Sequence, residues 1–320
     1  MLPWLLLALG IVAFVAVFVL VVARICYKRV FYSPPRRPLR EDEYPTPRGE
    51  IYDQYRPRMV EWIKQIRVME HLDVSIKSFD GLTLRGKYFE HTKGAPIELM
   101  FHGYRGTAEA DLAGGVYRAF AQGRSALIVD HRGAGASEGN VISFGVNESR
   151  DCLAWIDFVV EHIDTDAKII LTGISMGAAT VLTAAGEELS PNVVGVIADC
   201  GYSTPRAIIK KVIRDMHLPA DLLYPFVRLG ARVYGRFDPD ARSPLAAMPH
   251  CRVPVIFFHG DTDDFVPCAM SEENYAACAA PDKRLVITKG AGHGLCLPMD
   301  PQAYLANLAT FFEPYLKQAK

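Results

Sequence analysis

The chain starts with an uninterrupted apolar run. Residues 2–23 contain no charged side chain and are rich in Leu, Val, Phe and Ala. As a helix rising 1.5 Å per residue, this run reaches about 33 Å, which is enough to cross the hydrocarbon core of a bilayer. A cleaved signal peptide would have a basic start, a shorter apolar core and a small-residue cleavage site, and the run shows none of these. We therefore expect residues 1–23 to form a transmembrane anchor.

A basic, proline-rich segment follows the apolar run and sets the expected orientation. Lys and Arg gather on its carboxyl side and none precedes it, and such residues mark the cytoplasmic flank of a membrane span. These residues are Arg24, Lys28, Arg29, Arg36, Arg37 and Arg40. We expect residues 24–50 to be an extended linker, with the N-terminus outside and the rest of the chain on the cytoplasmic face. The same cations could bind anionic lipid headgroups or simply lie in solvent.

Residues 51–320 have the pattern of one α/β domain. Apolar residues recur at helical spacing over 58–70, which predicts a helix packed on the domain, and 75–89 alternates around the hairpin signal Asp80-Gly81. Short apolar runs separated by helical segments then follow, at 97–101, 125–130, 168–172, 193–198, 254–259 and 284–288. Such alternation predicts a mostly parallel sheet with helices on both faces. An active site is then expected beyond the carboxyl ends of the strands.

Composition narrows the class of function. The 320 residues are half hydrophobic, and their net charge of −1 gives no electrostatic reason to expect nucleic-acid binding. Seven cysteines are scattered without a Cys-x-x-Cys pair, which argues against a disulfide framework and favours a reducing compartment.

The most informative motif is Gly173-Ile174-Ser175-Met176-Gly177, between an apolar run and a stretch of small residues. A serine at a sharp strand-to-helix turn has its hydroxyl exposed, and flanking glycines let the strand and the helix approach closely. A helix that starts at Met176 also points free N–H groups toward the serine. We expect Ser175 to be a nucleophile. The competing interpretation is a glycine turn whose serine merely caps the helix.

Two further segments supply the partners that such a serine needs. Asp263 follows the run 254–259, and His293 lies in a glycine-flanked loop after the run 284–288. An aspartate can orient the histidine, and the histidine can take the proton of the serine. Asp264 is the alternative to Asp263. A calcium loop is not expected here, because the ligand spacing and the terminal glutamate are missing.

Backbone amides beside the serine are expected to stabilise an oxyanion. The turn at His102-Gly103-Tyr104 follows the run 97–101, and the amides of Tyr104 and Met176 are the expected donors. His102 is interpreted as bonding the loop backbone, not as the catalytic base.

The loop after 125–130 is interpreted as structural. Its glycines indicate tight turns, and Asp130 and Arg132 are expected to tie it by charge-assisted hydrogen bonds. His131 could line the pocket.

On these motifs the sequence resembles the α/β-hydrolase superfamily, in particular bacterial membrane-anchored hydrolases similar to serine aminopeptidases. The order nucleophile, acid, base along the chain is also the order in that fold. The matching segments, within residues 70–315, are Asp80-Gly81, His102-Gly103-Tyr104, the loop from Asp130 to Ser137, the Ser175 turn, the segment from His259 to Pro267, and Gly292-His293-Gly294. The resemblance implies the α/β-hydrolase fold, supports Asp263 over Asp264, and implies that an insertion at about 201–248 is a helical cap.

The resemblance also implies the activity. It indicates a serine hydrolase that cleaves carboxyl esters or thioesters through an acyl-enzyme on Ser175, with no cofactor and no metal. A peptidase of the serine aminopeptidase type is one alternative, and a catalytically inactive, membrane-tethered binding protein is another. An epoxide hydrolase or dehalogenase of this fold would carry an aspartate in place of Ser175. The apolar and cationic residues of the cap would suit an amphipathic acyl substrate or simply pack the cap onto the core.

Overall fold

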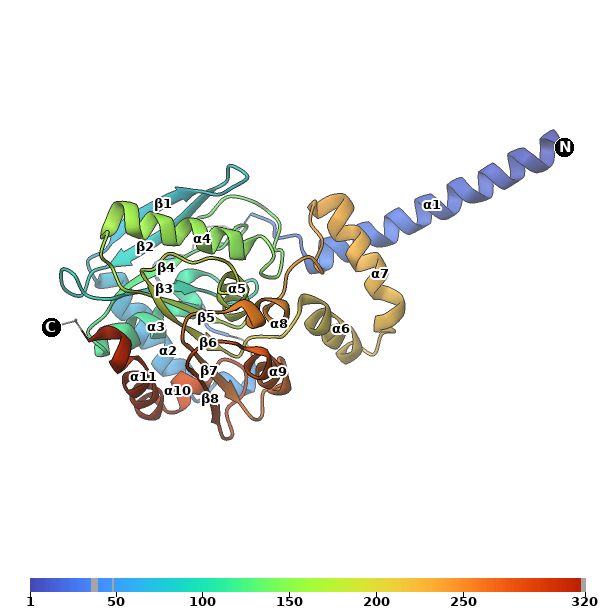
Figure 1. Ribbon diagram of the computed structural model, residues 1–320. Helices are drawn as coiled ribbons and strands as arrows, with labels where there is room; N and C mark the ends of the chain where they lie inside the picture. Colours follow the sequence, from blue (N-terminus) through green and yellow to red (C-terminus); the bar gives the residue numbers. More distant parts are fainter. Residues whose placement is uncertain (36–39, 48, 318–320) are drawn as a thin grey trace.

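The computed structural model describes residues 1–35, 40–47 and 49–317 of the chain. Arg36, Arg37 and Pro38, which belong to the expected basic linker, lie outside the described residues. In the described part, a central sheet carries helices on both faces, and one long helix projects from it (Figure 1).

The central sheet is mostly parallel. Its strands are β1 Leu72–Lys77, β2 Thr83–Phe89, β3 Ile97–Phe101, β4 Ser125–Val129, β5 Ile169–Ile174, β6 Val193–Asp199, β7 Val255–Gly260 and β8 Lys283–Thr288. They lie in the order β1-β2-β4-β3-β5-β6-β7-β8. The pairs β1–β2 and β2–β4 are antiparallel, and the pairs from β4 to β8 are parallel. This arrangement confirms the predicted fold class.

The strands match the predicted apolar runs closely, because most of the runs are buried on both faces. All residues of β3, β4 and β7 are buried, whereas β8, at the edge of the sheet, is mostly half-buried. The predicted hairpin is also present. Its turn contains Gly81 at φ +88°, a backbone conformation that residues with a side chain rarely adopt.

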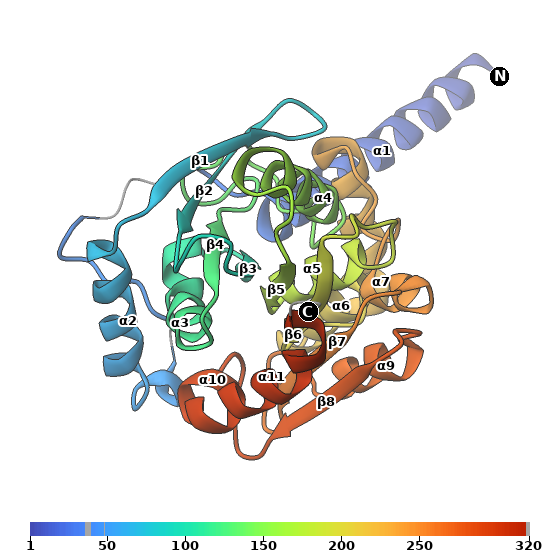
Figure 2. The same ribbon diagram turned by 60° about the vertical axis from the view of Figure 1, so that its left-hand side comes forward.

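Two layers of helices cover the sheet, as Figure 2 shows. The main helices are α2 Arg56–Val68, α3 Ala108–Ala121, α4 Glu148–Phe158, α5 Met176–Ala184, α9 Ala269–Ala277 and α11 Pro301–Leu316. Leu99 and Phe101 of β3 pack with α4, α5 and α9, and Met100 packs with α2, α3 and α11 on the other face. Alternate residues of one strand thus enter different clusters, as the pleat requires. Because Trp62 and Ile63 of α2 are buried, the predicted helix does pack on the domain.

The first helix, α1, extends from Leu2 to Val30 and so continues past the expected end of the anchor. It is the one helix in the described part of the chain that is long and apolar enough to cross a membrane, and its apolar window is fully exposed. The carboxyl-terminal end of α1 packs into the rest of the protein. Ala23 and Tyr27 of the helix and Phe31 directly after it are buried there. The segment from Arg24 to Val30 is therefore helix and not the start of an extended linker.

Helices also occupy the expected cap region. The elements there are α6 Pro205–Asp215, α7 Ala220–Gly230, the π-helical turn η3 Ala231–Gly235 and α8 Pro244–Ala247. α7 packs against the end of α1 that enters the protein (Figure 1). Gly230 permits this close crossing, because a Cβ at this position would lie 2.3 Å from the carbonyl oxygen of Ala23.

Several arginines of the cap form ion pairs with neighbouring carboxylates. Arg206 bonds Asp240, and Arg228 bonds Asp238 at 2.8 Å. Arg232 also bonds Asp238. These ion pairs therefore connect the segments of the cap to one another.

Candidate active site

Ser175 lies at a sharp turn between β5 and α5. Its backbone has φ +56° and ψ −116°, a conformation that costs a residue with a side chain about 1–3 kcal/mol. The glycines of the motif make the turn possible, because a Cβ at Gly173 would lie 2.1 Å from the oxygen of Gly177, and one at Gly177 would lie 2.0 Å from the oxygen of Phe101. The Ser175 side chain makes no capping hydrogen bond to α5. Its hydroxyl is thus not used as a helix cap.

Ser175, His293 and Asp263 form one hydrogen-bonded chain. His293 Nε2 is 3.0 Å from Ser175 Oγ, and His293 Nδ1 is 2.7 Å from Asp263 Oδ2. The three residues come from the carboxyl ends of β5, β8 and β7 respectively. Asp264, the alternative acid, is exposed, and Asp263 is the residue that contacts His293.

Asp263 is buried but fully bonded. Its Oδ1 accepts hydrogen bonds from the amides of Phe265 at 3.0 Å and Val266 at 2.8 Å, and its Oδ2 also lies 3.2 Å from His259 Nε2. Burial alone would raise the pKa of Asp263, but the hydrogen bonds from His259 and His293 outweigh it and hold the pKa well below its usual value. The sequence analysis did not predict that His259 contacts Asp263. The signal that could have indicated it is the spacing, since His259 lies four residues before Asp263.

The loop after β3 runs beside Ser175. A Cβ on Gly103 would lie 3.5 Å from Ser175 Cβ, and the Gly103 amide donates to Asp111 Oδ2 at 2.9 Å. The amides of Tyr104 and Met176, the expected oxyanion donors, have no acceptor within the described residues. Met176 is the first residue of α5, so no carbonyl of its own helix can accept from it. Neither amide is therefore already bonded within the described residues.

His102 and His131 form a buried pair behind this loop. The His131 amide donates to His102 Nε2 at 3.0 Å, which agrees with the structural role expected for His102. His131 packs against Phe101, with ring centroids 5.6 Å apart, and is buried, so it does not line the pocket. Burial holds the pKa of His131 well below its ordinary value.

Asp130 and Arg132 hold their loop through partners other than each other. Asp130 accepts from the backbone amides of Ala108 at 2.8 Å and Ala136 at 2.9 Å. Arg132 is buried and bonds Asp151 at 2.7 Å. The loop is structural, as expected, and both side chains tie it by charge-assisted hydrogen bonds.

Two residues that the sequence did not indicate hold His293 in place. The Tyr52 hydroxyl donates to the carbonyl oxygen of His293 at 3.0 Å, from the short helical turn η1 Glu50–Tyr52. The ring of Phe265 lies edge-on to the His293 imidazole, with centroids 5.1 Å apart. Tyr52 and His293 are 241 positions apart, so no local pattern could reveal this contact.

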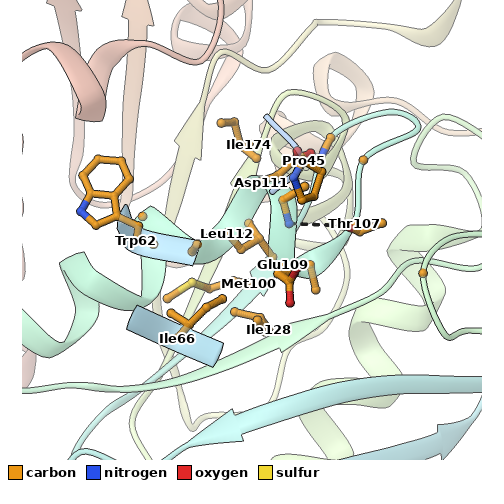
Figure 3. Close-up of a pocket in the computed structure, with 18 of the residues that line it drawn as sticks. Pro45, Trp62, Ile66, Met100, Thr107, Glu109, Asp111, Leu112, Ile128 and Ile174 are labelled. Atoms are coloured by element: carbon orange, nitrogen blue, oxygen red, sulfur yellow. Dashed lines mark hydrogen bonds between the residues drawn. The ribbon is translucent and has the colours of Figure 1, made fainter. Parts of the chain in front are cut away.

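A cavity of about 1460 Å³ adjoins Ser175 and His293. Figure 3 shows side chains of α2, α3 and the sheet converging on it. Its apolar lining includes Trp62, Ile66, Met100, Leu112, Ile128 and Ile174. The cavity exceeds the roughly 300–1,000 Å³ of common small-molecule sites, and charged residues such as Arg67, Glu109 and Asp111 also line it.

The cluster of potential metal ligands at the site has another explanation. One atom each of Cys200, Asp263 and His293 lie within 4.8 Å of one another. Burial raises the pKa of the Cys200 thiol well above its ordinary value, which disfavours the thiolate that a metal would need. The remaining two atoms hydrogen-bond each other. These residues therefore do not fit a metal centre.

Comparison with known proteins places this site in a family. The chain is 28% identical to an uncharacterised protein of Bacillus subtilis over 192 residues, which cover 60% of this chain and 63% of that protein. An uncharacterised protein of Mycobacterium tuberculosis is 29% identical over 227 residues, covering 69% of this chain and 72% of that protein.

A solved structure shares the fold. An esterase of Pyrococcus furiosus superposes with a TM-score of 0.67 at 19% identity, covering 90% of this chain and 99% of that one. The model of the Alpha/beta hydrolase family matches residues 99–307, a stretch that contains Ser175, Asp263 and His293. The protein therefore belongs to the alpha/beta hydrolase family.

Proposed function

We propose that this protein is a serine hydrolase that cleaves carboxyl esters or thioesters through an acyl-enzyme on Ser175. The observation that carries the proposal is the hydrogen-bonded chain from Ser175 through His293 to Asp263, which starts at a strained turn. The family and the likeness to an esterase support the same reaction.

The first half of the reaction forms the acyl-enzyme. His293 Nε2 takes the proton of Ser175 Oγ as this oxygen bonds to the substrate carbonyl carbon, and Asp263 stabilises the imidazolium through Nδ1–H. The carbonyl oxygen becomes an oxyanion that accepts from the amides of Tyr104 and Met176, and losing one such donor typically costs about 3 kcal/mol of barrier. His293 then gives its proton to the alkoxide or thiolate, which leaves as the carbon–oxygen or carbon–sulfur bond breaks.

The second half releases the acid. His293 takes a proton from water, and the resulting hydroxide bonds to the acyl carbon to form a second tetrahedral intermediate. When this intermediate collapses, the bond to Ser175 Oγ breaks and His293 returns the proton to that oxygen. The products are a carboxylic acid and the free enzyme.

The cavity suggests where the acyl chain would lie. Ile174, which is half-buried, directly precedes Ser175, and the exposed ring of Phe265 lines the same cavity. Burying each methylene of a chain against such walls contributes about 0.8 kcal/mol. We therefore propose substrates with an apolar acyl group.

The proposal is tested by ester hydrolysis with the full-length protein in detergent. p-Nitrophenyl esters of increasing acyl length should be turned over, and Ser175→Ala should lower kcat by a factor on the order of 10⁶ while leaving the fold intact. Ser190→Ala is a matched control, because Ser190 precedes β6 at the opposite end of the sheet. Turnover by Ser175→Ala at the wild-type rate would refute the nucleophile, and activity on aminoacyl amides alone would favour a peptidase.

We also propose that α1 anchors the protein as a single membrane span, with the N-terminus outside and the hydrolase domain on the cytoplasmic side. The length and hydropathy of α1 support the span. Arg24, Lys28 and Arg29 at its carboxyl end support the orientation, and the seven cysteines, all of them free thiols, suit a reducing compartment.

Orientation is tested with a tag at the carboxyl end in a bacterial host. Protease should remove the tag in inverted membrane vesicles and spare it in intact spheroplasts. Removal in spheroplasts would reverse the orientation. An intact mass that lacks the first 20 or so residues would show a cleaved signal sequence instead of an anchor.

A further inference from the structure

The last turn of α1 is bonded to the loop that carries the Tyr104 amide. The Tyr104 hydroxyl donates to the carbonyl oxygen of Val30 at 2.7 Å. The Arg105 guanidinium donates to the oxygen of Arg29 at 2.9 Å and to that of Tyr32 at 3.4 Å. Carbonyls at the end of a helix lack donors from their own helix, and the negative end of the helix dipole favours a cation there. The Tyr104 hydroxyl and the Arg105 guanidinium therefore supply donors to carbonyls at the end of α1, and Arg105 also supplies a positive charge.

The same junction is packed with aromatic rings. Phe31, directly after α1, is fully buried and lies 5.7 Å from Phe144 and 5.1 Å from Phe237 between ring centroids. Phe144 in turn lies 4.9 Å from the Tyr104 ring. Met176, whose amide is the second expected oxyanion donor, belongs to this buried cluster. Packing thus connects the end of α1 with both sides of the proposed oxyanion site.

Backbone strain is stored at this junction. Arg105 has φ +56° and Phe144 has φ +55°, in the left-handed region that favours glycine. Such a residue is strained and persists only where its surroundings hold it. Both residues contact the segment from Arg29 to Tyr32 directly, one by hydrogen bonds and the other through Phe31. These contacts with the end of α1 help to keep Arg105 and Phe144 in their strained conformations.

We propose that the last turn of α1 positions the oxyanion loop, and that the Tyr104 side chain is the positioning group. The proposal rests on the serine hydrolase function proposed above. The Tyr104 amide would bind the oxyanion, while the hydroxyl of the same residue fixes that amide by bonding Val30. An amide displaced by a fraction of an ångström loses hydrogen-bond energy in the transition state, where the charge on the oxygen is largest.

Tyr104→Phe tests this directly, because it keeps the amide and the ring and removes only the hydroxyl. In the full-length protein in detergent, kcat for a p-nitrophenyl ester should fall about tenfold while KM changes less than about twofold, since complete loss of an oxyanion donor costs 10²–10³ in rate. Inhibition by an alkylboronic acid, which forms a tetrahedral adduct on the serine, should weaken by a similar factor.

Tyr234→Phe is the matched control. The Tyr234 hydroxyl also donates to a carbonyl of α1, that of Leu20 at 3.1 Å, but Tyr234 lies in η3 and not in the oxyanion loop. This variant should keep the wild-type kcat and boronate affinity. If both tyrosine variants lower kcat equally, the effect comes from loosening α1 in general, and the positioning role of Tyr104 is refuted.

A second variant covers the case in which Tyr104→Phe folds poorly. Arg105→Gln removes the bonds to Arg29 and Tyr32 and should lower kcat without raising KM. Wild-type kcat in both Tyr104→Phe and Arg105→Gln would overturn the inference. A wild-type protein without any turnover that depends on Ser175 is a different result, because it overturns the hydrolase proposal itself.

Discussion

At the scale of single residues, Asp263 is a buried carboxylate whose two oxygens both have several polar partners. Besides its bonds to two amides and to His293, it faces His259 Nε2 at 3.2 Å. The same nitrogen lies 2.8 Å from the oxygen of Val266, and Ser271 Oγ lies 2.7 Å from Nδ1 of the same ring. Because Nε2 faces two acceptors, it carries a proton. His259 thus fixes Asp263 in the way that Asp263 is proposed to fix His293.

Replacing Asp263, the proposed acid, should change which ring nitrogen of His293 carries the proton. In Asp263→Asn, the amide can donate to His293 Nδ1, which places the imidazole proton on Nε2 and removes the base, so kcat should fall by about 10⁴. Asp264→Asn is the adjacent control, because Asp264 is exposed, and it should keep most of the activity. Steady-state kinetics of both variants decide the assignment, and a larger loss in Asp264→Asn would reverse it.

The low pKa of Asp263 has a consequence for stability in acid. A carboxyl whose pKa is lower in the folded state than its unfolded value of about 3.9 stabilises the fold above that value and loses the contribution as pH falls below it. Wild type should therefore lose stability relative to Asp263→Asn as pH falls from about 5 to 3. Urea unfolding across this range measures the difference, and a constant gap would contradict the lowered pKa.

At the scale of elements, the strand-to-helix turn at Ser175 was predictable because its requirements are local. The glycines on either side are needed for backbone contacts within a few residues and with one neighbouring strand. The end of α1 was not predictable in the same way. Lys28 and Arg29 looked like the polar flank of a membrane span, and only the surface formed by α7 and the loop after β3 shows why the helix continues to Val30.

The crossing of α1 and α7 should depend on Gly230. In Gly230→Ala, the new Cβ would lie 2.3 Å from the oxygen of Ala23, so the helices must separate and the free energy of unfolding should fall by about 1–3 kcal/mol. Gly10→Ala is the control within α1, because a Cβ there meets nothing within 4 Å. Thermal unfolding in detergent compares the two, and equal midpoints would show that the crossing contributes nothing.

At the scale of the whole molecule, sequence and structure divide the chain differently. The sequence predicted the sheet, its helices and the three strand-end residues, since buried runs and glycine turns follow from local chemistry. It placed the start of the hydrolase domain at residue 51. Yet Tyr27 and Phe31 are buried in the same cluster as Met176, next to Ser175. Contacts of this kind depend on surfaces that form only after folding, and periodicity does not reveal them.

In the proposed arrangement, the unbroken course of α1 sets the distance of the proposed active site from the bilayer. With α1 spanning the bilayer as proposed, the first 20 residues of the helix account for about 30 Å, and its remaining turns stand about 13 Å beyond the hydrocarbon edge. The helix passes directly into the buried Phe31, so no extended linker separates it from the domain that carries Ser175. A membrane-borne substrate would then be selected first by how far its ester stands above the bilayer, before any wall of the cavity touches it.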